Sequence, residues 1–105
     1  MDKGEAIKIA QRYISSLIGK YDIESAYLYG SFAKGTNHSD SDIDLALVLA
    51  SIHDIIDVQI DLMQMRTDED LLIEPHPFRK EDFNANNPVV AEILKNGIEI
   101  RNYAA

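Results

Sequence analysis

The residues best suited to chemistry lie in one stretch, YGSFAKGTNHSDSDIDLAL at positions 29–47. Asp42 and Asp44 are two residues apart at the start of an apolar run, so in a strand both carboxylates leave the same face. Two carboxylates held close together repel each other, and a bound divalent cation removes that penalty. The chain contains no cysteine, which favours a hard cation such as Mg²⁺ on oxygen ligands.

A glycine turn upstream of this acid pair is suited to an anion. Gly30 follows a β-prone segment, and Ser31 opens a predicted helical turn, which offers backbone N–H groups and a hydroxyl to phosphate oxygens. Lys34, one turn further on, can add a positive charge. Metal-assisted phosphoryl transfer requires both a phosphate cradle and a metal clamp, and this segment supplies the residue types for each.

A third carboxylate has to come from a neighbouring strand. Glu74, at the end of LLIE, is the strongest candidate, because an acid in an otherwise apolar strand is costly unless it is paired or metal-bound. Glu81 and Asp82 lie in a predicted polar loop and are weaker candidates. Asp40 is expected only to cap the turn before the strand.

The sequence GS at 30–31, followed by DID at 42–44, resembles the signature of the nucleotidyltransferase superfamily with the DNA polymerase β-like fold. The likeness is greatest to the minimal nucleotidyltransferases (MNT), small domains encoded beside HEPN-domain proteins. This resemblance implies transfer of AMP from ATP to a hydroxyl group, with release of pyrophosphate and with two Mg²⁺ ions as cofactors.

The resemblance also implies roles for single residues. Gly30 and Ser31 would hold the terminal phosphates of ATP, while Asp42 and Asp44 would hold the metals. Glu74 would take the place of the third acid, which in this superfamily binds metal and activates the acceptor hydroxyl. That place usually holds aspartate, so here the carboxylate lies one methylene further from the backbone.

A protein partner is the other implication of the resemblance. Several minimal domains of this kind resemble antitoxins that AMPylate a tyrosine of a HEPN ribonuclease toxin and thereby silence it. The 18 acidic and 10 basic residues give a net charge of −8, which suits a basic partner and disfavours nucleic acid as the main partner. Homo- and hetero-oligomers are both compatible with the sequence.

Two alternative functions stay open. One is an antitoxin that works by binding alone, with a vestigial active site. The other is an enzyme that modifies a small molecule, as the aminoglycoside nucleotidyltransferases do. The absence of a second substrate-gripping domain in the chain weighs against the small-molecule enzyme.

Predicted helices and strands alternate along the chain, and they position these residues. Their order predicts a small α/β domain of the α+β kind, with a mixed sheet of three or four strands covered by helices. Helices are expected over 2–18, 52–66 and 88–96, with one helical turn at Ser31–Lys34. Strands are expected over 24–30, 41–50 and 98–102, and a further strand from 70 should end near Pro75 and Pro77.

Several other side chains are given structural interpretations. His76, between two prolines beside Glu74, is interpreted as structural or exposed, with a place lining the site as the alternative. His38 and His53 show no ligand spacing, and Tyr27 and Tyr29 are interpreted as packing residues. Asp54, Asp57 and Asp61 are expected to form the solvated face of a helix or to meet a basic partner, and Tyr103 is expected in a frayed tail, with self-modification as the alternative.

The length of 105 residues predicts one nucleotidyltransferase-like domain over 1–105. No apolar run approaches the roughly 18 residues of a membrane span. The N-terminal segment alternates charged and apolar residues and lacks a signal-peptide core, so a cytoplasmic protein is expected.

Overall fold

The computed structural model describes residues 1–103, and its centre is a four-stranded mixed sheet with strand order β3-β2-β1-β4. The strands are β1 (Ile23–Tyr29), β2 (Ile43–Leu49), β3 (Ile73–Arg79) and β4 (Ile98–Glu99). β1 pairs antiparallel with both β2 and β4, whereas β2 and β3 run parallel. The predicted α+β class with a mixed sheet is confirmed.

The three longer helices begin where a side chain accepts hydrogen bonds from their first free N–H groups. They are α1 (Lys3–Leu17), α2 (Ser31–Lys34), α3 (Ile55–Gln64) and α4 (Pro88–Asn96), with short 3-10 helices η1 (Asp68–Asp70) and η2 (Lys80–Asp82). Asp2 caps α1 and Asn87 caps α4. The helix expected over 52–66 is shorter at its start, because the Asp54 carboxylate accepts the N–H groups of Ile56 and Asp57 and so sets its beginning.

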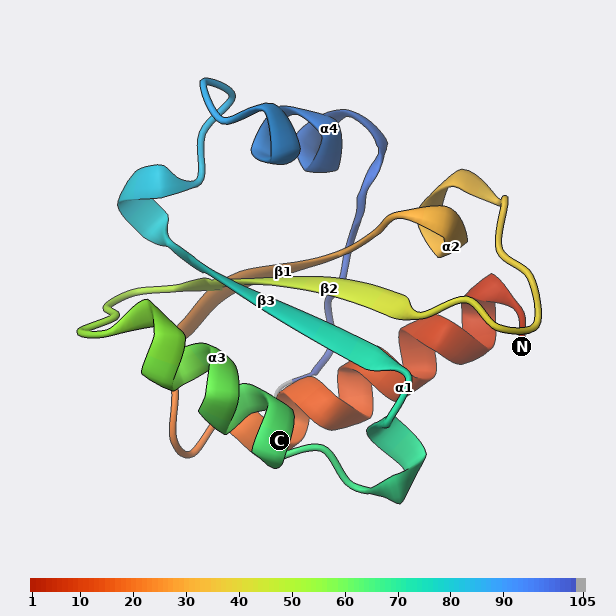
Figure 1. The fold of residues 1–105 in the computed structure, drawn as a ribbon, viewed down its shortest axis with the longest axis horizontal. Coiled ribbons are helices and arrows are strands. Elements are labelled where there is room, and N and C mark those ends of the chain that lie inside the picture. The colour runs from red at the N-terminus through yellow and green to blue at the C-terminus, as the bar shows by residue number, and fades with distance from the viewer. Residues whose placement is uncertain (104–105) are drawn as a thin grey trace.

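Helices lie on both sides of the sheet. In Figure 1, α1 and α3 lie below the sheet and α4 lies above it. The main core joins α1, α3 and the lower face of β2, and its members include Ala10, Tyr13, Ile14, Ile43, Leu45, Leu47, Leu49 and Leu62. On the other face Ala46 and Val48 are buried as well, and so are Val90 and Ile93 of α4. β2 is therefore covered on both faces except at its start, where the acids lie.

The third strand does not end at its prolines, which corrects the prediction from the sequence. β3 starts later than expected, after η1, and continues through Pro75 and Pro77 to Arg79. It is an edge strand, and edge strands tolerate proline where the missing N–H would point away from the neighbour. The Pro75 carbonyl does point outward, since it accepts a 2.7 Å hydrogen bond from the Gln59 side-chain amide on α3.

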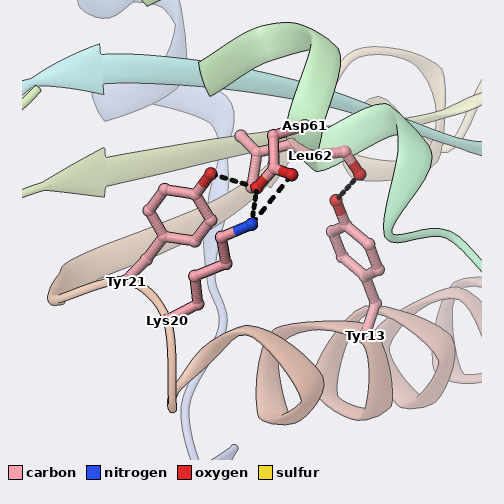
Figure 2. Close-up of polar contacts among 5 residues, drawn as sticks. All are labelled: Tyr13, Lys20, Tyr21, Asp61 and Leu62. Carbon is pink, nitrogen blue, oxygen red and sulfur yellow. Dashed lines mark hydrogen bonds and ion pairs between the residues drawn. The ribbon is translucent and has the colours of Figure 1, made fainter. Parts of the chain in front are cut away.

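A polar cluster joins the end of α1 to α3 (Figure 2). The Asp61 carboxylate accepts from the Tyr21 hydroxyl and pairs with Lys20 at 2.9 Å, and the buried Tyr13 hydroxyl donates to the Leu62 carbonyl at 2.6 Å. The expectation that Asp61 belongs to a solvated helix face was therefore wrong.

The C-terminal segment is held against α1. The Arg101 carbonyl accepts from Gln11, the Tyr103 carbonyl accepts from Ser15, and the Tyr103 side chain is half-buried against the core. The frayed tail expected at Tyr103 was thus wrong for this residue. Among the helices of the described residues, none is long and apolar enough to cross a membrane.

Candidate active site

Strand pairing brings the acids together at the start of β2. In the parallel register Asp44 lies opposite Glu74, and in the antiparallel register it lies opposite Tyr29. Residues that are opposite in a sheet project from the same face, so all three side chains leave the sheet on the α4 side. The sequence predicted Asp44 and Glu74 as a pair across neighbouring strands, and the register places them so.

Asp42 lies just outside the sheet. It is exposed and directly precedes β2, whose first residue Ile43 donates a 2.7 Å hydrogen bond to the Leu72 carbonyl. The chain reaches this point through a turn closed by Ser41, whose hydroxyl accepts from the His38 N–H at 2.8 Å. The turn and the Ile43–Leu72 bond fix where the acid-bearing segment enters the sheet.

Gly30 provides the space in which the Asp44 carboxylate lies. Its φ of +74° and ψ of −148° are open to glycine and strained for other residues. A Cβ built on Gly30 would lie 3.3 Å from Cγ of Asp44 and closer still to Oδ2. Only glycine therefore allows the turn and the carboxylate to approach one another this closely.

Ser31 and Lys34 lie at the two ends of the short helix α2. Ser31 is half-buried at its first position, where helical N–H groups lack intrahelical acceptors. The Lys34 ammonium pairs with Glu92 of α4 at 2.9 Å, and this pairing lowers the pKa of the Glu92 carboxyl. The predicted phosphate contact of Lys34 would require it to leave a pair in which both side chains are about half exposed, 50% and 43%.

Two aromatic side chains that the sequence interpretation treated as structural lie against the acids. Tyr29 is half-buried, and its pKa is raised by burial and then by the negative charges of Asp44 and Glu74. The His76 ring meets Tyr29 edge-on at 5.6 Å between centroids, and its Nε2 is 3.5 Å from Oδ1 of Asp44. Residues two apart in a strand point to the same face, so the spacing of Glu74 and His76 was the signal that could have placed His76 at the site. The prediction that the strand ends near the prolines weakened that signal.

The donors fit a divalent cation only in part. Within residues 1–103, no three His, Asp or Glu side chains converge closely enough to hold a metal by themselves. Mg²⁺ is usually bound through one or two carboxylates together with substrate phosphates. Asp42 and Asp44 match that mode better than a closed protein cage, because they supply two carboxylates beside the glycine turn and leave the other ligands to a substrate.

Comparison with known families supports this interpretation of the fold. Residues 11–103 match the family described as polymerase beta, nucleotidyltransferase. No curated protein matches the chain.

Among solved structures, the chain resembles a Sulfolobus solfataricus protein assigned as a nucleotidyltransferase, with a TM-score of 0.67 and 15% identity over 92% of this chain and 80% of that one. It also resembles a toxin–antitoxin complexed with AMP-PNP, with a TM-score of 0.64 and 23% identity over 86% of this chain and 70% of the other. A mutant of the toxin–antitoxin MntA-HpeT gives a TM-score of 0.60 and 20% identity, covering 96% and 73% of the two chains.

At these identities the structural likeness speaks for the fold alone. The family match spans nearly the whole chain and includes the glycine turn, the acid pair and Glu74. The chain belongs to the polymerase β nucleotidyltransferase family.

Proposed function

We propose that this chain is a Mg²⁺-dependent adenylyltransferase that moves AMP from ATP to a tyrosine hydroxyl of a HEPN-type toxin, and so acts as the antitoxin of the pair. The observation that carries the proposal is the meeting of Gly30, Asp44 and Glu74 at one end of the sheet in a nucleotidyltransferase fold. Structural neighbours that are toxin–antitoxin complexes, one of them with AMP-PNP, support the choice of partner and nucleotide.

Each site residue is given a proposed binding role that is consistent with its position. Gly30 and Ser31 hold the terminal phosphates, because they lie at the start of α2, where backbone N–H groups lack intrahelical acceptors. Asp42 and Asp44 hold the divalent cations, which when bound neutralise the charge on the triphosphate. Lys34 is placed to add a further contact once it leaves Glu92.

In the proposed reaction the acceptor oxygen forms a bond to the α-phosphorus of ATP. The bond from that phosphorus to the bridging oxygen of pyrophosphate breaks, and pyrophosphate leaves. Glu74, opposite Asp44 on the edge strand, is proposed to take the proton of the acceptor hydroxyl. Because β3 is the outer strand, an acceptor can approach Glu74 from the side away from the phosphate cradle.

The surface beside His76 suits a protein acceptor. A groove of about 340 Å³ runs between α3 and β3, and its lining residues are Ile55, Ile56, Gln59, Ile60, His76, Pro77 and Phe78. Ile56 and Ile60 are 68% and 50% exposed, and the acids Asp54 and Asp57 are exposed at the start of the same helix. An apolar groove beside exposed acids fits a toxin segment with apolar and basic side chains better than a second, equally acidic copy of this chain.

The deciding experiment is intact-mass spectrometry of the toxin after incubation with this chain, ATP and Mg²⁺. We expect one or more AMP groups on the toxin with the wild-type chain and none with Asp44→Asn. Asp40→Asn is the matched control, because Asp40 is an exposed acid of the same segment outside the proposed site.

The outcome also separates the proposal from a binding-only antitoxin, which the glutamate in place of the usual third aspartate keeps as the main competitor. A toxin that is neutralised with no change in mass, equally well by wild type and Asp44→Asn, would establish binding alone and refute the transferase.

A further inference from the structure

We infer that His76 is a positioning residue: its imidazole orients the Asp44 carboxylate for cation binding. The inference deepens the proposed function and rests on it in one respect, namely that Asp44 is a ligand of the divalent cation. His76 itself is assigned no contact with metal or substrate.

The first support is an unsatisfied nitrogen that faces the carboxylate. Nε2 of His76 is buried and has no hydrogen-bond partner within residues 1–103, although the side chain as a whole is 39% exposed. Oδ1 of Asp44 lies 3.5 Å away, slightly beyond hydrogen-bond length. A small rotation of the Asp44 carboxylate closes this distance, and buried polar atoms in native structures normally find a partner.

The second support is that the ring has little freedom to turn elsewhere. His76 stands between Pro75 and Pro77, whose rings fix the local backbone, and Gln59 ties the Pro75 carbonyl to α3 at 2.7 Å. Its ring edge packs against Tyr29 from the side of β1. The direction of Nε2 is therefore set by the edge strand and not by the carboxylate.

The third support is that the two oxygens of Asp44 have different surroundings. Oδ1 faces His76, whereas Oδ2 faces the space left by the missing side chain of Gly30. A proton on Nε2 would hold Oδ1 and leave Oδ2 directed toward the phosphate cradle. Groups that orient a carboxylate ligand in this way typically change metal affinity by about 10–100-fold when removed.

The test is Mn²⁺ titration of the isolated chain by electron paramagnetic resonance, with Mn²⁺ as the probe in place of Mg²⁺. His76→Ala should bind Mn²⁺ about 10-fold or more weakly than wild type. His76→Gln should regain most of the affinity, because its terminal amide N–H reaches close to the position of Nε2. His53→Ala is the matched control, since His53 is exposed in the loop before α3.

A second measurement does not depend on the cation. Long-range ¹H–¹⁵N spectra of the imidazole, at a pH where the ring is neutral, should show the proton of His76 on Nε2, and Asp44→Asn should weaken that preference. A proton on Nδ1 in the wild-type chain would overturn the inference, whatever the Mn²⁺ result.

The two proposals fail separately. AMP transfer to the toxin together with unchanged Mn²⁺ affinity in His76→Ala would overturn the positioning role and leave the transferase standing. A loss of Mn²⁺ affinity in His76→Ala and its recovery in His76→Gln, without AMP on the toxin, would support the positioning role and refute the transferase. A wild-type chain that binds no Mn²⁺ would overturn the positioning role outright.

Discussion

Gly30 shows how the absence of a side chain shapes the site at the scale of single residues. Its positive φ turns the chain from β1 into α2, and the space above its Cα is occupied by the Asp44 carboxylate. Gly35, at the other end of α2, also has a positive φ of +75°, but nothing lies within 4 Å of a Cβ built there. The two glycines thus share a backbone requirement and differ in what surrounds them.

This difference gives a matched pair of substitutions. Gly35→Ala should lower the free energy of unfolding by about 1 kcal/mol, through backbone strain alone. Gly30→Ala should lower it further and also weaken Mn²⁺ binding and AMP transfer, because the new methyl group displaces Asp44. Urea unfolding and Mn²⁺ titration measure the two effects. Equal Mn²⁺ affinity in both variants would contradict the role given to Gly30.

At the scale of elements, Lys20 and Tyr21 in the turn after α1 connect that turn to α3. Both side chains bind the Asp61 carboxylate of α3 (Figure 2). The Tyr21 hydrogen bond, followed by Lys20, lowers the pKa of Asp61 below its ordinary value of 3.8. Burial, followed by the same hydrogen bond, raises the pKa of Tyr21 to about 12.

These shifts predict a loss of stability at both ends of the pH range. Below pH 3.8 the unfolded chain binds a proton at Asp61 more readily than the folded chain, so stability falls as pH drops through the lowered folded pKa. Above pH 10 the unfolded chain loses the Tyr21 proton first, so stability falls as pH rises toward about 12.

Urea unfolding across pH checks both signs. Asp61→Asn should flatten the acid slope, and Tyr21→Phe should reduce the alkaline slope without removing it, because burial also raises the pKa of Tyr13 and of Tyr29. If Asp61→Asn kept the wild-type slope of the free energy of unfolding at acid pH, or Tyr21→Phe kept it at alkaline pH, the pair would contribute no pH-dependent stability.

The exposed face of α3 offers another comparison between elements. Ile60→Asp should weaken the complex with the toxin by tenfold or more, since a charge would enter an apolar contact. Leu94→Asp on α4 is the matched control, because Leu94 is 49% exposed and Ile60 50%. Isothermal titration calorimetry measures both affinities. Equal losses of toxin affinity in the two variants, or no loss in Ile60→Asp, would show that the toxin does not bind at the exposed face of α3.

At the scale of the whole molecule, the net charge of −8 acts over a longer range than any single contact. For association with a basic toxin it predicts a rate constant that falls by about tenfold or more between roughly 0.05 M and 0.5 M salt. The dissociation rate should change less, since the groove between α3 and β3 is mainly apolar. Stopped-flow mixing at several ionic strengths measures both rates, and a salt-independent association rate would argue against a basic partner.

Most of the architecture could be predicted from local patterns. The helical period over 2–18, the alternation in β2, and Asn87 as cap with Pro88 at the first helical position each describe a local preference, and each of these elements formed within a residue or two of the expected bounds. β3 was predicted too short, because the proline rule depends on whether a strand lies at an edge, and this is a property of the sheet. That residues 1–105 form one domain stays a prediction.

The sequence alone supplied the residues of the proposed chemistry, namely two aspartates after a glycine turn and an acid in an apolar strand, in a pattern that resembles a nucleotidyltransferase family. Tertiary structure alone decided which side chains meet. His76 and Tyr29 lie beside Asp44 because a parallel and an antiparallel register converge there, and Lys34 pairs with Glu92 because α4 folds back over the sheet. The physical reason is that local sequence sets the direction of each side chain, whereas long-range strand pairing sets its neighbours.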